Sequence, residues 1–526
     1  MPMSTSFPRT FSAGFPMPGL RTALTVLACC LGLIPTQAQL QRVTVDSDLP
    51  SAAAGGISLY STGNELIREA NGSLTVAYAR NRAADPTVSP NFVFLARTAD
   101  AGAHWSYQRT DQFPKVARPD CLLRLPAGGY LLGTTFNTQG FVNRSTNGTD
   151  WLPLSADSEL GRVFPSSTGT NSHGVVLDID ASGTLHMAYT RTFETSAYPW
   201  NIGYRSSKDG GVTWSAETDL TQIPHDFEGQ GFGAFYPALT TGPGGKVFVA
   251  YSRFYKTNIV ANGATNVVHY NVPQLSEFNG TKWLPAQTFG DPSISWFSYP
   301  SVAVDGNGHL HTIHVQHPGK LANGRVIYRK LPKGTSTFSD PVLISPDTNN
   351  AVNITLSVFE TDTVVASWDD EGYDGATLTF RAVYAATSAD GFQRNILVST
   401  PGAVGRAPAL RNRIGAFSSP EKIDILWVEN DPSKDGTTPQ DRLMYAELGS
   451  TIPRFVIQSV VRSNSGATLR YTGVKGRQYQ VESSSNLNGW TPLGAAVLSS
   501  GTSTAVELTT GTTTGSQFYR ISDVTP

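Results

Sequence analysis

Charged residues are scarce in this sequence, at 15 % of 526 residues. Disordered chains that are kept unfolded by their charge contain far more charged residues, and so do coiled coils. The composition therefore excludes both classes. The 39 basic and 41 acidic residues also nearly cancel, which leaves a formal charge of -2. Such a chain has no field that attracts a nucleic-acid backbone, and we expect no nucleic-acid partner.

Cysteine is scarcer still, with three residues in the whole chain. Cys29 and Cys30 lie in a segment that we expect to be removed, which leaves Cys121 alone in the mature protein. A single cysteine cannot form an internal disulfide, so packing must stabilise the fold. The aromatic content of 10 % is enough to fill a large core.

The N-terminal residues 1–38 have the pattern of an export signal. Arg9 and Arg21 supply positive charge, residues 22–34 form an apolar stretch, and small residues precede a cleavage site after Ala38. The pattern predicts a protein that is secreted or held at the cell surface.

A lipoprotein is the alternative interpretation of this segment. It would be acylated at Cys29, but Leu27 is bulky where such sites usually carry small residues. No later apolar run is long enough to cross a bilayer, so we expect no transmembrane segment.

Long helical patterns are missing, and one β pattern returns along the chain instead. Each copy has a short strand, a turn that contains Gly, a second strand that ends in aromatic residues, a polar loop and a third strand. The apolar residues alternate with period two, as half-buried strands require. The clearest copies are 173–189, 236–251 and 299–314, and weaker ones start near Tyr60, Arg118, Asn353 and Arg406.

These copies make seven units of roughly 40 to 60 residues, which is the period of a propeller blade. The sequence therefore predicts an all-β fold, a β-propeller of seven blades over residues 39–450, with six blades as the alternative. The last unit shows only three strands. We expect residues 42–46 to supply its fourth strand and close the ring, which removes an exposed edge.

A second motif marks the turn after the third strand of a unit. Residues 98–105 and 207–214 both have Ser or Thr, Asp, Gly and Trp at the spacing Ser/Thr-x-Asp-x-Gly-x-x-Trp. We expect the Asp to accept backbone N–H bonds across the turn and the Trp to pack between sheets, burying on the order of 200 Å². Shortened forms occur at 145–151, 279–283 and 388–391.

With these motifs the chain resembles the secreted Asp-box, or BNR-repeat, propellers, the superfamily that includes sialidases and several polysaccharide lyases. The resemblance covers about Gln39 to Leu448 and implies a carbohydrate-active propeller. Asp boxes also occur in propellers that catalyse nothing, so the motif alone does not imply an enzyme.

After Pro453 the composition changes to Ser, Thr and Gly with alternating strands, which predicts a second domain over residues 453–526. Residues 479–484 and 518–522 resemble a small β-sandwich module found at the ends of exported bacterial proteins. The segment has no His and few ionisable groups. The resemblance therefore implies attachment or sorting at the cell surface, with no second active site.

Propeller geometry decides which side chains can meet. The starts of the first strands and the ends of the second strands converge around the axis, on the face opposite the Asp-box turns. Arginine binds a carboxylate with charge-assisted bonds, and aromatic faces stack on sugar rings, so an acidic glycan suits the residues found there. We predict substrate-binding roles for Arg118, Arg191, Tyr299, His314, Trp368, Asp369 and Arg406.

Two consecutive units carry the most specific pattern, with His173 in one and Tyr236 and Arg253 in the next. It resembles the His, Tyr and Arg constellation of propeller polysaccharide lyases such as those that act on ulvan. The resemblance implies that Arg253 neutralises a uronate carboxylate, that His173 or Tyr236 takes the neighbouring proton, and that Tyr236 protonates the leaving oxygen. The second His of that constellation is missing, and Arg191 stands near its place.

Purely structural roles for the same residues also stay open. His173 also fits a strand-start residue bonded to a neighbouring loop. The dipeptide Tyr236-Pro237 returns as Tyr299-Pro300, so it also fits a packing feature of the repeat.

Lyase-type elimination in an acidic polysaccharide is the function that we favour, and two others remain. A sialidase-like hydrolase would gather Arg118, Arg253 and Arg406 around a carboxylate, with Asp369 or Asp370 as the acid. The Arg-Ile-Pro opening common in sialidases is missing from the sequence. A glycan-binding or adhesive propeller without catalysis is the third possibility.

No cofactor and no metal site are predicted, although a structural cation is compatible with the sequence. Four histidines gather at 309, 311, 314 and 317. Strand alternation places His309 and His311 on one face and His314 on the other, so a single zinc ion cannot easily bind all of them.

Overall fold

A computed structural model of the chain divides it into two units. One comprises Leu40–Ile452 and the other contains Pro453–Pro526. The structure describes residues 40–50, 65–69, 71–81, 91–100, 102–109, 118–136, 139–151, 171–192, 200–223, 233–261, 264–294, 299–317, 323–345, 349–358, 363–374, 377–388, 391–393, 395–410, 422–430, 440–449, 455–463, 466–473, 478–484, 490–498, 503–509 and 518–523. The predicted export signal lies outside these residues.

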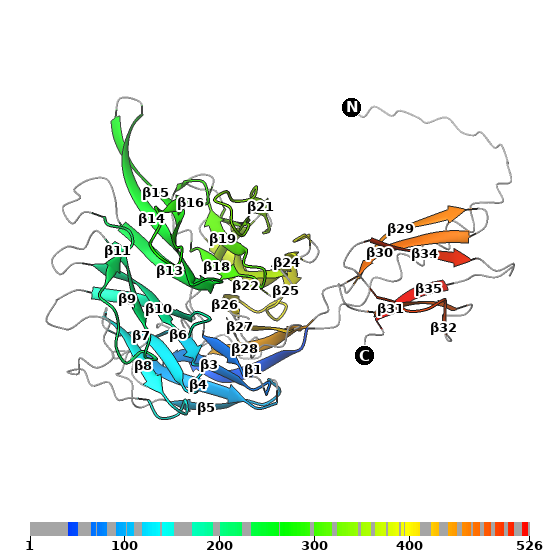
Figure 1. Ribbon diagram of the computed structural model, residues 1–526, viewed down its shortest axis with the longest axis horizontal. Helices are drawn as coiled ribbons and strands as arrows, with labels where there is room; N and C mark the ends of the chain where they lie inside the picture. The colour runs from blue at the N-terminus through cyan, green and yellow to red at the C-terminus, as the bar shows by residue number, and fades with distance from the viewer. Residues whose placement is uncertain are drawn as a thin grey trace, which may run out of the picture. The chain divides into compact units, whose positions relative to one another are not determined.

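The regular elements of the described residues are all β-strands, and those of the larger unit form a propeller-like ring of sheets (Figure 1). This confirms the predicted all-β class. The first sheet is antiparallel and consists of β2 (Leu66–Arg68), β3 (Leu74–Asn81), β4 (Asn91–Thr98) and β5 (Ser106–Arg109). The next contains β6 (Arg118–Arg124), β7 (Tyr130–Phe136) and β8 (Gln139–Ser145).

A nine-stranded sheet follows. Its first group is β9 (Asn171–Ile179), β10 (Leu185–Thr192), β11 (Trp200–Ser207) and β12 (Thr218–Asp219). Its second is β13 (Gly233–Gly242), β14 (Lys246–Ala261), β15 (Ala264–Phe278), β16 (Gln287–Thr288) and β17 (Ser293–Ile294). The hairpin of β14 and β15 extends well beyond the other strands of this sheet (Figure 1).

Three four-stranded antiparallel sheets complete the ring. The first is β18 (Ser301–Val304), β19 (Leu310–Gln316), β20 (Arg325–Leu331) and β21 (Val342–Leu343). The second is β22 (Asn350–Val358), β23 (Val364–Asp374), β24 (Thr377–Thr387) and β25 (Ile396–Leu397). The last is β26 (Gly405–Leu410), β27 (Lys422–Asn430), β28 (Gln440–Gly449) and, from the other end of the unit, β1 (Arg42–Pro50).

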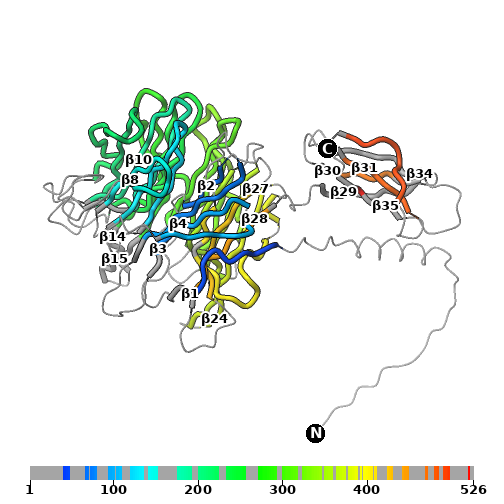
Figure 2. The backbone as a smooth tube through the Cα atoms, turned by 90° about the horizontal axis from the view of Figure 1, so that it is seen from below, coloured from blue at the N-terminus to red at the C-terminus, as the bar shows by residue number. Residues whose placement is uncertain are grey.

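The pairing of β1 with β28 is the closure that the sequence predicts. Arg42 lies opposite Ala446 and Thr44 opposite Met444 in an antiparallel register, and Figure 2 shows the two strands side by side. The closure is also a packing interface, because Val45 joins residues of the first and last sheets in one buried cluster.

The blade number stays a prediction, because one parallel pair, Trp200 with Gly233, joins two strand groups into the nine-stranded sheet. A buried cluster lies between these groups and contains Ile202 from one and Val249 from the other. Face-to-face packing of this kind is what separate blades show, so it favours two blades here and seven in the ring.

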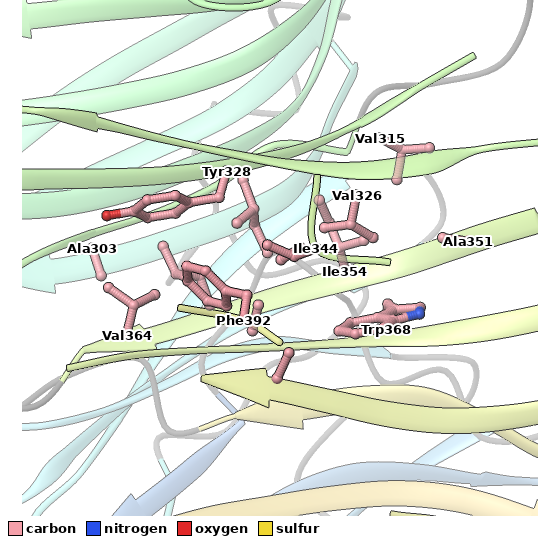
Figure 3. Close-up of a cluster of buried hydrophobic side chains, with 14 of the residues drawn as sticks. Ala303, Val315, Val326, Tyr328, Ile344, Ala351, Ile354, Val364, Trp368 and Phe392 are labelled. Atoms are coloured by element: carbon pink, nitrogen blue, oxygen red, sulfur yellow. The ribbon is translucent and has the colours of Figure 1, made fainter. Parts of the chain in front are cut away.

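Apolar side chains fill the spaces between neighbouring sheets. Figure 3 shows one such cluster, in which Tyr328 and Val326 of β20 meet Trp368 and Val364 of β23. Trp368 is wholly buried there, and its indole nitrogen is turned away from Phe392 (Figure 3). The period-two pattern of each strand supplies this core, since alternate residues face the adjacent sheet.

The turns 98–105 and 207–214 share one hydrogen-bond pattern. Asp209 accepts the backbone N–H of Thr213 at 2.9 Å, and Asp100 accepts that of His104 at the same distance. In the first turn, Trp105 contacts the ring of Tyr445 in the last sheet, with centroids 5.4 Å apart. The carboxylate thus holds the turn while the indole packs between two sheets.

Two buried histidines are each held between an Asp and a Tyr. His311 contacts Asp305 at 2.8 Å and Tyr328 Oη at 2.9 Å. His186 is placed in the same way between Asp180 and Tyr204. Each Asp also accepts a backbone N–H of the turn that follows it, so each group ties a turn to the middle of its sheet.

The smaller unit consists of two packed β-sheets. One contains β29 (Phe455–Ser463), β30 (Gly466–Gly473) and β34 (Ser503–Thr509). The other contains β31 (Gln478–Ser484), β32 (Thr491–Pro492), β33 (Val497–Leu498) and β35 (Phe518–Asp523). Leu469 and Tyr471 of the first pack against Tyr479 and Val481 of the second. Among the described residues of the chain, no helix has the length and apolarity needed to cross a bilayer.

We expect the substitution His311→Leu to lower the free energy of unfolding by about 3 kcal/mol, because it leaves Asp305 and Tyr328 buried without that partner. Urea denaturation of the purified protein measures this. His309→Leu is the matched control, since His309 accepts a single bond from the Lys333 backbone and should cost about 1 kcal/mol. Equal losses in the two variants would contradict a structural role for the buried Asp, His and Tyr group.

Candidate functional site

The innermost strands of several sheets carry a bulge near their first residues. The register shifts between Phe235 and Ala238 in β13 and between Val352 and Thr355 in β22, and comparable shifts occur in β9 and β26. We call the edge of the ring that carries these bulges the bulge edge. The starts of the first strands and the ends of the second strands meet there, which is where propeller geometry places a site.

Left-handed backbone recurs at the bulge edge. Tyr236 has φ 56° and Tyr299 φ 39°, and Gly174 and Asn353 have the same conformation in their own strands. For a tyrosine this conformation costs about 1 to 2 kcal/mol, so the surrounding sheet must hold it in place. The two tyrosine rings contact each other with centroids 4.8 Å apart, which brings two consecutive inner strands together.

Further aromatic side chains surround this pair. Phe235 contacts Trp200 of β11 and Phe254 of β14, with centroids 5.7 Å and 5.3 Å apart. These rings, like those of Tyr236 and Tyr299, are half-buried. The bulge edge therefore presents partly exposed aromatic surface around Tyr236, which suits stacking on a sugar ring.

In four sheets, one residue of the second strand lies opposite the bulge, and it is buried. Tyr189, Tyr251, Trp368 and Trp427 occupy this position, and the register of β19 gives the corresponding place to His314. His314 is 1 % exposed, and burial lowers its pKa to about 3, with the charge of Arg329 adding to the effect. Neither ring nitrogen of His314 has a hydrogen-bond partner among the described residues.

The substrate-binding roles of His314 and Trp368 stay predictions, and their burial counts against direct contact with a ligand. Both side chains pack between sheets at the position opposite the bulge, and the structure does not bring them to the surface. The sequence pattern correctly placed them at the ends of second strands.

Two residues further along the second strands the side chains are polar. Arg191 and Arg253 are equivalent there, since Arg191 lies opposite Ser172 and Arg253 opposite Ala234. Asp370 and Glu429 take the same place in later sheets. This row is the part of the bulge edge that can offer charge to a ligand.

Arg191 is bound by acids of its own sheet. Its guanidinium lies 2.9 Å from Glu217 and 2.9 Å from Asp219. Glu217 also accepts a hydrogen bond from Tyr189 Oη at 2.8 Å. The charge of Arg191 is therefore already balanced, which makes it a weak partner for a substrate carboxylate.

Arg253 is different, because it forms no ion pair within the described part of the chain. Its guanidinium lies over the ring of Tyr255, 4.9 Å from the centroid, and donates a long bond of 3.4 Å to the Phe254 carbonyl. Burial lowers the pKa of Arg253, whereas for the similarly buried Arg381 the carboxylate of Asp369 raises it. Arg253 is thus a partly desolvated cation whose charge is balanced by no acid of the described residues.

The remaining predicted residues have other places. Arg406 forms an ion pair with Asp441, so its charge is also balanced. The side chains of His173 and Arg118 lie outside the described residues; the backbone of His173 pairs with Thr190 and that of Arg118 with Thr135. Their predicted roles stay predictions.

Asp369 belongs to three consecutive carboxylates at the end of β23, each bonded by an asparagine of the neighbouring segment. Asn353 donates to Asp369, Asn349 to Asp370 and Asn350 to Glu371. Arg381 bonds both Asp369 and Glu371. Burial raises the pKa of Asp369 to about 6, although Arg381 and Asn353 lower it.

Sequence reasoning missed the partners that decide which cations are available. Glu217, Asp219 and Asp441 cancel predicted arginines, and Tyr255 supports Arg253. Period two could have indicated Tyr255, which follows Arg253 on the same strand face. Among the described residues no group of His, Cys, Asp or Glu could hold a metal ion.

No protein-family model and no curated protein matches the sequence. Solved structures show distant similarity. A protein of unknown function from Dyadobacter fermentans matches at 13 % identity over 77 % of this chain and 98 % of its own, with a TM-score of 0.41. An ulvan lyase, described as a new family of polysaccharide lyase, matches at 12 % identity over 78 % and 96 %, with a TM-score of 0.49.

Other neighbours in this comparison act on carbohydrates as well. An α-L-arabinofuranosidase from Fusarium graminearum matches at 13 % identity over 78 % of this chain and 97 % of its own, with a TM-score of 0.41. A microbial sialidase is also among the matches. The structural neighbours thus include carbohydrate-active propeller enzymes, both lyases and glycosidases.

The raised pKa of Asp369 gives a prediction for pH. The folded chain holds the proton more tightly than the unfolded chain, where the pKa is 3.8, so this stabilisation is complete below about pH 4 and is lost as the pH rises through 6. Relative to Asp369→Asn, we expect the free energy of unfolding of the unsubstituted protein to fall by about 2 kcal/mol between pH 4 and pH 7. Urea denaturation at both pH values measures this. Asp374→Asn, at an exposed carboxylate of the same strand, is the control, and a parallel change in both variants would contradict the assignment.

Proposed function

We propose that this chain is a secreted carbohydrate-active enzyme that cleaves glycosidic linkages of an acidic polysaccharide at the bulge edge. The observation that carries the proposal is Arg253. It is a half-buried arginine without an ion pair in the described part of the chain, one strand away from Tyr236 and beside partly exposed aromatic rings. A uronate sugar has both groups that such a site can bind. Its carboxylate can pair with the arginine, and its apolar ring face can stack on the aromatic rings.

The energetic reason is desolvation. A guanidinium that is already partly removed from water loses little more when a carboxylate binds, and each charge-assisted bond contributes about 1.5 to 3 kcal/mol. A bidentate contact also fixes the plane of the carboxylate. Arg191 and Arg406 offer much less, because acids of the protein already occupy their N–H groups.

Lyase-type elimination is the reaction that we favour. Arg253 binds the uronate carboxylate and spreads the negative charge that develops when the neighbouring C5 proton leaves. His173 or Tyr236 takes that proton, the electron pair forms a C4–C5 double bond, and the C4–O bond to the next sugar breaks. Tyr236 protonates the leaving oxygen. The left-handed backbone that holds Tyr236 is the kind of strain found at functional sites.

Sialidase-like hydrolysis is the second candidate. Asp369, whose pKa of about 6 suits a proton donor, is the observation in its favour. The side chain is completely buried and bonded by Arg381, and Arg406 is paired with Asp441, so we rank hydrolysis below elimination. A glycan-binding propeller without catalysis is the third.

One assay separates the three. The protein is incubated with uronate polysaccharides and sialylated glycans; elimination yields an unsaturated uronate that absorbs in the ultraviolet, and hydrolysis yields reducing ends without that absorbance. A binder only retards the polysaccharide in a gel. We expect the absorbance to rise.

We expect Tyr236→Phe, His173→Ala and Arg253→Gln each to lower that rate by roughly 10² or more, as acid, base and charge-stabilising groups do. Initial rates of absorbance increase are the measurement. Tyr373→Phe is the matched control, because Tyr373 lies on the exposed part of β23 and should leave the rate unchanged. Full activity in all three site variants would remove this assignment.

We further propose that residues 1–38 direct export and that residues 453–526 attach the protein to the cell surface. The first part rests on the sequence pattern, and the second on the resemblance of the C-terminal segment to modules of exported proteins. Expression in a bacterial host with and without residues 453–526 tests attachment. We expect the truncated protein to be released into the medium with its activity retained, and equal surface retention of both forms would contradict the proposal.

A further inference from the structure

Two equivalent arginines of the bulge edge are held in place by different chemistry. Arg191 and Arg253 occupy the same position relative to the bulge in neighbouring strand groups. Arg191 is fixed by Glu217 and Asp219, two carboxylates. Arg253 has no acid beside it in the described part of the chain, and an aromatic ring supports it instead.

That ring is Tyr255, two residues further along β14 on the same strand face. The guanidinium carbon of Arg253 lies 4.9 Å from the ring centroid, well within the range of a cation–π contact. Such a contact attracts the cation but carries no net charge. It restricts the side chain of Arg253 and leaves its positive charge, and most of its N–H groups, for another partner.

Tyr255 is itself held rigidly. Its ring stacks on that of Tyr270, the residue directly opposite in β15, with centroids 5.3 Å apart and planes at 14°. Its hydroxyl accepts a hydrogen bond from Gln274 Nε2 at 3.3 Å. Tyr270 pairs in turn with Ile294 of β17, so the support for Arg253 extends across the base of the long hairpin.

Arg191 contributes to the same result. Burial raises the pKa of Tyr251, two residues before Arg253 on β14, and the charge of Asp219 adds to the effect. Asp219 is bound by Arg191 at 2.9 Å. The charge of Asp219 is thus balanced by Arg191 of the neighbouring strand group.

We infer that Tyr255 is the positioning residue of Arg253 and thereby determines that the site recognises carboxylate-bearing sugars. The inference rests on the proposed function. Tyr255 orients the guanidinium without cancelling its charge, and a carboxylate at position 255 would do the opposite. The residue at position 255 therefore determines whether Arg253 is available to bind a ligand or is held in a structural ion pair.

The experiment compares Tyr255→Phe, Tyr255→Leu and Tyr255→Glu in the full chain. The probes are glucuronan, polygalacturonate and alginate, each beside its carboxyl-reduced form, and the dissociation constant is measured by titration. Tyr255→Phe keeps the ring and should bind within about threefold of the unsubstituted chain, whereas Tyr255→Leu should bind about tenfold more weakly. Tyr255→Glu should pair with Arg253 and bind the acidic polymer roughly 10²-fold more weakly, close to the carboxyl-reduced form.

Tyr373→Leu is the matched control, because it removes an exposed tyrosine from the other long hairpin of the ring and should change nothing. Circular dichroism checks that each variant is folded, and if Tyr255→Glu does not fold, the contrast between Phe and Leu decides. Unchanged binding in both Tyr255→Leu and Tyr255→Glu would overturn the inference about Tyr255 and leave the proposed function standing. Failure of the unsubstituted chain to bind any acidic polymer in preference to its carboxyl-reduced form would overturn the proposed function itself.

Discussion

The backbone pairing of β1 with β28 is the constraint on which the rest of the larger unit depends. A ring of sheets that is not closed leaves two open edges, and the sheets can then move apart. Val45 of β1 packs into the cluster that also contains Leu66 and Tyr445, so the hydrogen bonds of the closure and the apolar contacts of the first and last sheets form together. Closure holds the first and last sheets together, and the clusters between the other neighbouring sheets complete the ring.

The bulge edge shows what this convergence achieves. A left-handed residue at the start of an inner strand turns the chain, and the second strand places a large side chain opposite it. At Tyr251 and Trp368 that side chain is aromatic, and at His314 it is an imidazole kept neutral by burial. The repeat therefore uses one position for packing and the position two residues later for charge.

The arginines of the larger unit differ in whether a carboxylate balances their charge. Arg191, Arg381 and Arg406 each lie against carboxylates of their own sheet. Such pairs hold loops and strand ends together and leave little affinity for a ligand. Arg253, supported by a tyrosine, keeps its charge. Within the described residues, Arg253 therefore differs from the other arginines of the bulge edge in having no acid as its partner.

The sequence by itself determined the all-β class, the repeat and the closing strand, because period-two alternation and Gly turns are local signals that the backbone must obey. It also placed Tyr236 and Arg253 at strand ends that converge in a propeller. Tertiary structure alone decided how deeply each predicted residue is buried and which acids lie beside it. Whether a side chain at a strand end is half-buried, as with Tyr236, or fully packed, as with His314, depends on the neighbouring sheet. Whether the charge of an arginine is balanced depends on acids far away in the chain, such as Asp441 for Arg406. A local sequence pattern cannot indicate such a partner.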